Sequence, residues 1–341
     1  MNWKEIKILV IGTWLWLAAT TWLQAQHYPA GSEGIKGATL PPPGFYFEDY
    51  NSFYFYHKVP GFGGQLQTGF DQYSYTQSPR LMWVTPWKLL GADLGAAVRI
   101  PFTWQEYTRN VLHVVPPNLQ PGIGPANLGS FFYAKTTDAH FGLSDIQIEP
   151  LILAWHWKQM DAVASYSFWA PTGDFPGGAD NQNTGYLFYT LGQGYWTHMF
   201  TLGATWYFDA KKTWAISLLN HYEINTEQYS GLYNEPGGVE SLGTTLGDIY
   251  TLEWALSKTI LKGVDIGVTG YYQQQVTATD GPTPNGPTWE GERIHVAGIG
   301  PEISATSRQW GLTGSLRYAY EFSAMDHPQG QVIHLTLTKS F

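Results

Sequence analysis

The sequence predicts an all-β protein: a transmembrane, antiparallel, up-and-down β-barrel of about twelve strands. Three observations lead to this prediction. Segments of alternating apolar and polar residues recur along the chain, the connections between them alternate in length, and the composition suits a surface that faces lipid. Aromatic residues make up 16% of the chain and charged residues only 13%, whereas about 25% of a typical soluble protein is charged. Because the chain has no cysteine, we expect sheet closure and not disulfide bonds to hold it together.

The first 25 residues have the layout of a signal peptide. Lys4 and Lys7 give a positively charged start, residues 8–23 form an apolar core, and residues 23–25 (Leu-Gln-Ala) offer a cleavage site. A membrane-anchoring helix is the alternative, but the apolar run is somewhat short of the ~20 residues that such a helix needs. We therefore expect export through a cleaved signal peptide to the outer membrane of a Gram-negative bacterium.

Residues 26–43 are rich in glycine and proline and end in three consecutive prolines. This composition excludes a helix or a central strand. We expect the segment to enter the barrel from the periplasmic side as a leader or a small plug, and residues 44–341 to form the barrel itself.

Twelve segments are predicted as strands, in order along the chain. They cover residues 44–58, 80–87, 92–103, 145–157, 161–171, 195–208, 213–225, 247–259, 264–275, 293–306, 310–322 and 331–341. The first is densely aromatic, and the third places Leu94 and Val98 on one face and Asp93 and Arg99 on the other. In the fourth, polar and apolar residues change parity near Pro150, which indicates a bulge.

The later strands follow the same rule. The sixth has its large aromatic and aliphatic residues at one parity, and the eleventh alternates as clearly as the third. The tenth is irregular around residues 298–301 (Gly-Ile-Gly-Pro). The twelfth alternates Ile333 and Leu335 with His334 and ends in Phe341. Such an ending is typical of the closing strand of an outer-membrane barrel, and we expect the barrel assembly machinery to bind it.

The connections between these strands alternate between long and short. The long ones cover residues 59–79, 104–144, 172–194, 226–246 and 276–292, and the short ones cover residues 88–91, 158–160, 209–212, 260–263 and 307–309. Outer-membrane barrels have long extracellular loops and short periplasmic turns. With the N-terminus in the periplasm, every long connection lies outside; the last outer one, residues 323–329, is the short exception. A soluble β-sandwich, the alternative, does not predict this alternation.

The connection over residues 104–141 is unusually long and carries four prolines. We expect it to form a lid over the barrel or a constriction folded into the lumen.

Twelve strands leave a narrow lumen, between the eight-stranded barrels that side chains fill and the porins of sixteen or more strands. Strand parity predicts which side chains line it: Tyr46, Glu48, Tyr50, Tyr54, Asp93, Arg99, His221, Glu223, Glu253, Asp265, Arg317, Glu321 and His334. The tyrosines of the first strand form a ladder on which aromatic solutes could stack. Alternatively, these phenols fill space and bond across the barrel, and the inward carboxylates and arginines form structural ion pairs.

Motifs for other chemistry are absent from the sequence. There is no Gly-rich phosphate loop, no Gly-x-Ser-x-Gly and no His-Glu-x-x-His, so we expect no enzyme activity, no catalytic residue, no cofactor and no metal. His198, Asn220 and Asp248 fall near the outer ends of three consecutive strands, where a barrel lipase would place its triad, but no matching serine lies beside them. The net charge of −9 argues against nucleic-acid binding.

Several stretches, spread over nearly the whole predicted mature chain, resemble one family. They are His27-Tyr28-Pro29-x-Gly31-x-Glu33-Gly34-Ile35-Lys36-Gly37, Leu40-Pro41-Pro42-Pro43-Gly44-x-Tyr46, Pro171-Thr172-Gly173-Asp174-Phe175, Asn183-Thr184-Gly185, Asn225-Thr226 with Tyr229-Ser230-Gly231, Gly270-Tyr271-Tyr272-Gln273-Gln274 and Gly298-Ile299-Gly300-Pro301. The chain resembles the outer-membrane proteins named for the meta pathway of phenol degradation. The resemblance implies a channel or transporter for hydrophobic or aromatic compounds, without an established catalytic residue.

These observations predict a passive outer-membrane channel for small hydrophobic or aromatic compounds. Its expected partners are outer-membrane lipids and lipopolysaccharide, the solute, and the barrel assembly machinery; the sequence leaves a homo-oligomer open. The alternative is a surface barrel whose extracellular loops bind a partner or form an assembly, as an adhesin or structural protein does. A barrel lipase is a third hypothesis.

Overall fold

Antiparallel strands make up most of the fold. The computed structural model describes residues 27–60, 66–67, 71–115, 130–173, 191–230, 240–280, 294–325 and 327–341. The strands are β1 (Gly44–Pro60), β2 (Leu66–Gln67), β3 (Asp71–Leu89), β4 (Ala92–Arg99), β5 (Phe102–Val115), β6 (Ser130–Leu143), β7 (Ile146–His156), β8 (Met160–Ala170), β9 (Thr197–Tyr207), β10 (Trp214–Asn225), β11 (Glu227–Ser230), β12 (Glu240–Thr245), β13 (Ile249–Leu261), β14 (Val264–Gln275), β15 (His295–Ser307), β16 (Leu312–Met325) and β17 (Gln329–Ser340). Within the described ranges, no helix is both long and apolar enough to cross a bilayer.

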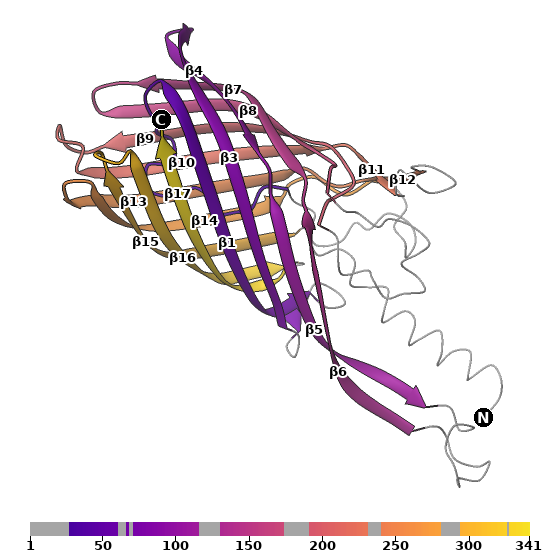
Figure 1. The fold of residues 1–341 in the computed structure, drawn as a ribbon. Helices are drawn as coiled ribbons and strands as arrows, with labels where there is room; N and C mark the ends of the chain where they lie inside the picture. The colour runs from indigo at the N-terminus through magenta and orange to yellow at the C-terminus, as the bar shows by residue number, and fades with distance from the viewer. Residues whose placement is uncertain are drawn as a thin grey trace, which may run out of the picture.

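Twelve of these strands close into a ring, as the sequence predicts (Figure 1). The order around the ring is β1-β3-β4-β7-β8-β9-β10-β13-β14-β15-β16-β17, and every neighbouring pair is antiparallel. The first and last strands close it, because β1 pairs with β17 from Tyr46↔Ser340 to Lys58↔Gln329. The ring has no free edge, which is how a barrel avoids unpaired backbone groups.

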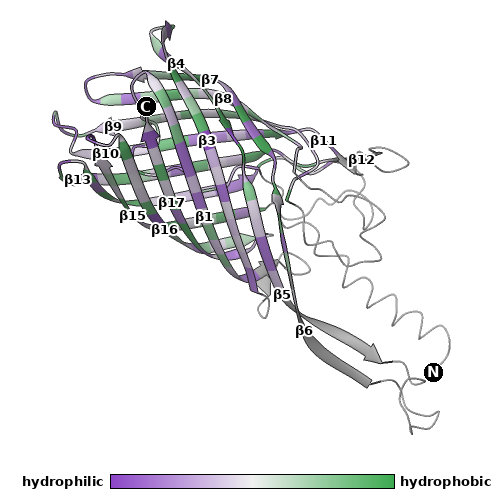
Figure 2. Cartoon of the chain, in the orientation of Figure 1, coloured by the Kyte–Doolittle hydropathy of each residue, from purple (hydrophilic) through white to green (hydrophobic). Residues whose placement is uncertain are grey.

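Side chains alternate between the inside and the outside of this ring. In β10, Trp214, Ile216 and Leu218 are exposed, whereas Ala215 and Ser217 between them are buried. Figure 2 shows the same alternation of apolar and polar residues along the barrel strands. Monomeric soluble proteins rarely expose contiguous apolar patches above a few hundred Å². The outer surface therefore suits contact with lipid chains.

Two irregularities expected from the sequence are present. The pairing of β7 with β8 shifts register between Ile148 and Leu151, on either side of Pro150. The pairing of β15 with β16 shifts between Ala297 and Gly298. Nearby, a Cβ on Gly300 would collide with the carbonyl oxygen of Tyr318 on the neighbouring strand, so this position requires glycine.

The short connections lie together at one end of the barrel, as predicted. Leu90 and Gly91 join β3 to β4 with positive φ angles of 53° and 78°. Between β9 and β10, the Asp209 carboxylate accepts hydrogen bonds from the backbone N–H groups of Thr213 (2.8 Å) and Trp214 (2.9 Å). The hydrogen bond from Trp214 contributes most to holding the pKa of Asp209 below its usual range.

Residues 104–141 connect β4 to β7 as predicted, but the prediction of a lid or a lumen constriction is wrong for the residues that the structure describes there, because they form two paired strands. β5 and β6 pair along their whole length, from Phe102↔Leu143 to Val115↔Ser130, and β5 also pairs with an extended β3. The four prolines that suggested a loop all lie in residues 116–129, outside the described residues, whereas the flanking β-branched and aromatic residues favour strands. In Figure 1 this β5–β6 ribbon continues past the rim of the barrel instead of folding over it.

Candidate functional site

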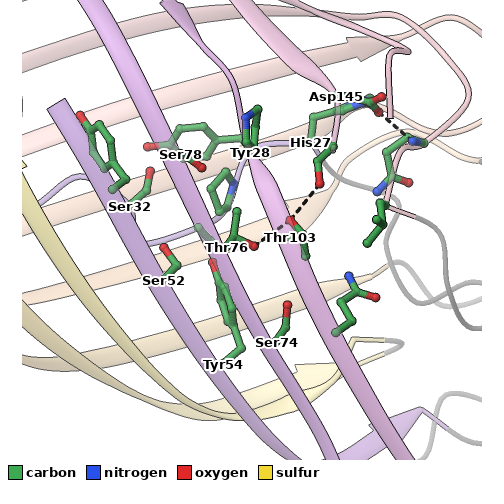
Figure 3. A pocket seen from close by; sticks show the side chains of 18 of the residues that line it. His27, Tyr28, Ser32, Ser52, Tyr54, Ser74, Thr76, Ser78, Thr103 and Asp145 are labelled. Atoms are coloured by element: carbon green, nitrogen blue, oxygen red, sulfur yellow. Dashed lines mark hydrogen bonds and ion pairs between the residues drawn. The ribbon is translucent and has the colours of Figure 1, made fainter. Parts of the chain in front are cut away.

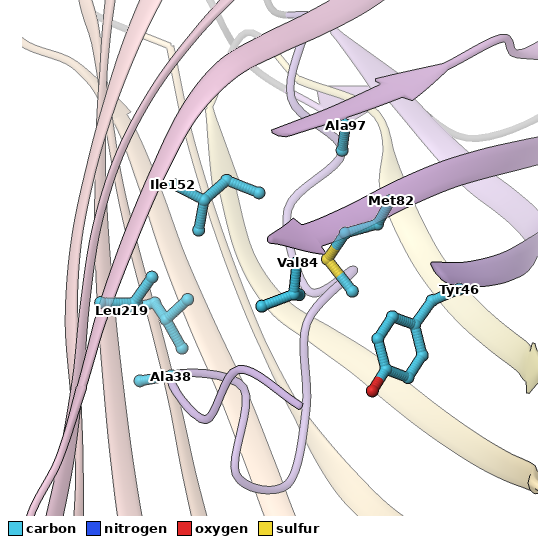
Figure 4. Close-up of a cluster of buried hydrophobic side chains, with 8 residues drawn as sticks. Ala38, Tyr46, Met82, Val84, Ala97, Ile152 and Leu219 are labelled. Carbon is cyan, nitrogen blue, oxygen red and sulfur yellow. The ribbon is translucent and has the colours of Figure 1, made fainter. Parts of the chain in front are cut away.

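The lumen contains residues 27–43, which we call the inner segment. Tyr28 and Ala38, near its two ends, are only 2% and 1% exposed. In Figure 4 the loop that carries Ala38 lies inside the wall, and Ile152 and Leu219 from the surrounding strands point toward it. The segment therefore runs through the barrel between walls that face it from several sides.

Carboxylates from the wall bind the backbone of the inner segment. Glu223 on β10 accepts hydrogen bonds from the backbone N–H groups of His27 (3.2 Å) and Tyr28 (3.4 Å). Glu253 on β13 accepts them from Gly31 (2.6 Å) and Glu33 (3.0 Å). These acidic side chains therefore supply the acceptors that a segment without secondary structure cannot find in itself.

A third carboxylate, Glu302 on β15, binds the middle of the segment. It accepts the backbone N–H of Ile35 (2.9 Å) and the Nε–H of Arg317 (3.0 Å). Arg317 also donates to the carbonyl oxygen of Gly31. A Cβ on Gly34 would overlap Glu302 and Arg317, so a glycine at this position allows the backbone to approach the ion pair.

Side chains of the inner segment also bond to the wall. His27 lies 2.7 Å from Asp145 and 2.7 Å from the Thr197 hydroxyl, and its ring stacks on Trp169 at 5.6 Å between centroids. Lys36 donates to Asp265 on β14 at 2.9 Å.

The segment is therefore anchored along its length, by aromatic and ionic contacts. Tyr28 stacks on His221 with 4.2 Å between centroids. Toward the short-turn end, the Thr39 hydroxyl donates to Asp161 at 3.1 Å.

Most residues predicted to line the lumen contact this segment. Besides Glu223, Glu253, Asp265, Arg317 and His221, these include Tyr46, whose hydroxyl donates to the Pro42 carbonyl (2.6 Å), Tyr50, whose hydroxyl donates to Glu33 (3.2 Å), and Arg99, 3.6 Å from Glu33. The first tyrosines of the ladder thus bond to the segment.

The remaining predicted residues pair within the wall. Glu48 pairs with Arg80 at 2.6 Å, Asp93 with Lys88 at 2.5 Å, Glu321 accepts the Tyr271 hydroxyl at 2.8 Å, and His334 lies 2.8 Å from the Ser52 hydroxyl. Tyr54 stacks on Tyr56 and borders a cavity described below.

Sequence reasoning missed several residues that hold the segment. Glu302 follows the irregular residues 298–301, where parity along the strand is lost. Asp145 and Asp161 stand at strand ends, where parity does not show which way a side chain points. Asp145 is nevertheless central, because it accepts His27 and the backbone N–H groups of Gly173 (2.8 Å) and Gln193 (2.7 Å). The signal in the sequence that could have found Asp145 and Asp161 is an acidic residue at the first position of a predicted strand.

Between the inner segment and the wall lies a cavity of about 140 Å³. Hydroxyl groups line one side of it, and Figure 3 shows Ser52, Ser74, Thr76, Ser78 and Thr103 there, on β1, β3 and β5. Aromatic and charged groups complete the lining, among them Tyr50, Tyr54, Arg99 and Trp169. The cavity therefore offers ring faces and polar groups together.

The residues of the lipase hypothesis do not form a triad. His198 lies 2.8 Å from the Tyr166 hydroxyl, Asp248 accepts the Tyr222 hydroxyl at 3.0 Å, and Asn220 accepts the Tyr250 hydroxyl at 2.6 Å. Each is thus paired with a tyrosine. Within the described ranges, no group of three His, Asp or Glu side chains is arranged to hold a metal ion.

Comparisons with known proteins agree with this fold. A family model described as "Putative MetA-pathway of phenol degradation" matches residues 58–337. The crystal structure of the COG4313 outer membrane channel from Pseudomonas putida F1 is similar with a TM-score of 0.65 at 12% identity, covering 93% of this chain and 100% of that chain. The Ralstonia pickettii toluene transporter TbuX has a TM-score of 0.41 at 11% identity, covering 91% and 92%. No curated protein matches the sequence. At such identities, the similarity to the channel shows a shared fold.

Proposed function

This chain belongs to the family described as the putative MetA-pathway of phenol degradation, and from that premise we propose that it is an outer-membrane channel for passive uptake of small hydrophobic or aromatic compounds. The observation that carries the proposal is the cavity of about 140 Å³ in the lumen. An engineered protein cavity of about 150 Å³ accommodates benzene. The cavity therefore has the size of a single aromatic ring, and tyrosine rings border it.

The outer membrane of a Gram-negative bacterium is the proposed location. The apolar outer surface of the ring and the ring closure support it, since only helices and closed barrels span membranes. The predicted signal peptide, residues 1–25, lies outside the described residues. Outer-membrane lipids and lipopolysaccharide, and the barrel assembly machinery at the strand ending in Phe341, remain its proposed partners.

The inner segment acts, in this proposal, as a plug. It bonds to β10, β13, β14 and β15, so a solute passes only beside it or after it shifts. Its bonds to the wall are polar, and each can be replaced by a hydrogen bond to water when the segment moves. This property suits a movable gate better than a permanent seal. No step of this passage requires chemistry on the solute, so we propose a non-enzymatic protein.

Solute flux tests the proposal. The purified full-length protein is reconstituted in liposomes, and swelling rates are compared for phenol, benzoate, glucose and sucrose. We expect phenol and benzoate to enter faster than the sugars. A protein that is folded by circular dichroism but passes no solute, in the wild type and after deletion of residues 27–43, contradicts a channel function.

The β5–β6 ribbon favours one alternative, a surface barrel that binds a partner. Among the described strands, residues 109–115 of β5 pair only with β6, and β6 has no second neighbour. Free strand edges can pair with another chain. Removal of residues 109–136 separates the two functions, because it abolishes partner binding at this edge and leaves solute flux unchanged.

A further inference from the structure

We propose that the lumen cavity binds a single-ring aromatic carboxylate, with the Arg99 guanidinium receiving the carboxylate group. This proposal names a solute class for the channel and rests on the proposed function.

Among the described residues, Arg99 is the lumen arginine whose carboxylate partner lies farthest away. Arg80 lies 2.6 Å from Glu48 and 2.5 Å from Glu149, and Arg317 lies 3.0 Å from Glu302. Arg99, in contrast, is 3.6 Å from Glu33, and its guanidinium lies over the Tyr50 ring at 4.3 Å.

Its burial makes the missing acceptor costly. Arg99 is only 4% exposed, and its Nε–H has no hydrogen-bond partner among the described residues. A buried N–H without an acceptor loses its hydrogen bond to water and does not replace it. The guanidinium therefore favours an acceptor supplied by a ligand.

A second unpartnered donor borders the same cavity. The indole Nε1–H of Trp169 is buried and finds no acceptor in the described part of the chain. In the backbone register, Arg99 on β4 stands opposite Gln147 on β7, and Gln147 stands opposite Trp169 on β8. The two donors thus stand in one row of the wall, two strand spacings or about 10 Å apart at the backbone. Both side chains line the same cavity.

The acids that border the cavity already have their donors. Asp145 accepts His27, Gly173 and Gln193, as described above, and Glu321 accepts the Tyr271 hydroxyl (2.8 Å) and the backbone N–H of Gly330 (2.8 Å). These hydrogen bonds compensate both carboxylates for their burial. In the described lining, the polar atoms without a partner are Arg99 Nε, Trp169 Nε1 and the hydroxyls of Tyr28 and Ser32. All four groups can donate a hydrogen bond, and a carboxylate, which carries acceptors only, complements donors.

The space and the lining specify the rest of the ligand. A volume of about 140 Å³ accommodates one six-membered ring and little more. Tyr50, Tyr54 and Trp169 supply ring faces and edges for stacking. A hydrocarbon such as toluene fits the space but leaves both donors unpaired, so the site discriminates against it.

Binding by the purified full-length protein in detergent tests the proposal. Isothermal titration calorimetry with benzoate, phenol and toluene measures affinity, and we expect benzoate to bind tightest. Arg99→Gln should weaken benzoate binding roughly 10- to 100-fold, the loss expected for a hydrogen bond to a charged group, and change phenol binding less than about threefold. Arg308→Gln, which removes the same charge in the turn between β15 and β16, is the matched control and should bind benzoate like the wild type.

A second variant covers the case in which Arg99→Gln does not fold. Trp169→Phe keeps a ring and removes the indole donor, so benzoate binding should weaken several-fold. Benzoate affinity unchanged in either folded variant, toluene binding as tight as benzoate, or no benzoate binding by the wild type overturns the proposal. Phenol flux through liposomes without benzoate binding refutes this site and leaves the channel function standing, whereas absence of all flux refutes the channel itself.

Discussion

At the scale of single residues, the lumen is organised by carboxylates that bind backbone N–H groups. Strand parity predicted Glu223, Glu253 and Arg317 as inward-facing from sequence, because alternation along a regular strand determines the side on which each side chain lies. It could not predict that Glu253 would bind Gly31 and Glu33, since that depends on the path of a segment without periodicity. The prediction of function from these residues alone had therefore to remain general.

Glu253 gives the first prediction. Glu253→Gln replaces one of the two oxygens that accept the N–H groups of Gly31 and Glu33 by an amide nitrogen, which cannot accept them, and this loosens the inner segment. In planar bilayers we expect more frequent opening or a higher mean conductance than in the wild type. Glu227→Gln, outside the barrel ring on β11, is the control. Identical single-channel records for wild type and Glu253→Gln would show that these bonds do not restrain the segment.

Arg80 gives the second prediction. Its guanidinium bridges Glu48 and Glu149, and all three side chains are largely buried. Arg80→Met therefore leaves two carboxylates close together without a cation. Removal of one partner from a buried ion pair costs about 3–5 kcal/mol, and we expect the free energy of unfolding to fall by about 3 kcal/mol. Urea unfolding in lipid vesicles, followed by tryptophan fluorescence, measures it. A loss below about 1 kcal/mol, equal to that of Arg308→Met, would contradict a structural role.

At the scale of elements, the register shifts within the strands were easier to predict than the points at which the strands end. The register shifts at Pro150 and at residues 298–301 follow from side-chain parity and from proline, which cannot donate to the ladder. The β5–β6 ribbon was missed because prolines in the middle of the stretch outweighed the strand-forming residues on both sides. Strand propensity reports a half-buried pleated surface, and it does not say whether that surface lies in a membrane or beyond it.

The ribbon gives the third prediction. Among the described strands, residues 109–115 and 130–136 pair only with each other, so replacement of residues 109–136 by a short Gly-Ser turn removes no pair of the ring. We expect the shortened protein to fold and to keep the heat-dependent shift in gel mobility typical of barrels, and its bilayer conductance should equal that of the wild type. Loss of the folded band would show that the ribbon contributes to the ring.

At the scale of the whole molecule, the ring and its contents are separable. All neighbouring strands of the ring pair through their own backbones, and the inner segment adds contacts only from within. The barrel could be predicted from the sequence, because alternation and connection lengths are repeated over twelve strands. The position of residues 27–43 could not, since a leader in the periplasm and a plug in the lumen have the same composition.

Deletion of residues 27–43 is the fourth prediction. The ring should still close, while the lumen loses its filling and single-channel conductance rises several-fold above the wild type. Bilayer recordings and the uptake of large antibiotics by cells that produce the variant measure this change. Equal conductance with and without the segment would mean that another part of the chain closes the lumen.

The seam between β1 and β17 has a consequence for biogenesis. It joins the first strand of the barrel to the strand that follows all the others along the chain, whereas the inner segment precedes every strand. Threading that segment into a finished cylinder would carry His27, Glu33 and Lys36 lengthwise past a packed interior. Sealing the seam around a segment already seated avoids that passage, so the segment that precedes every barrel strand becomes the part that the final strand encloses.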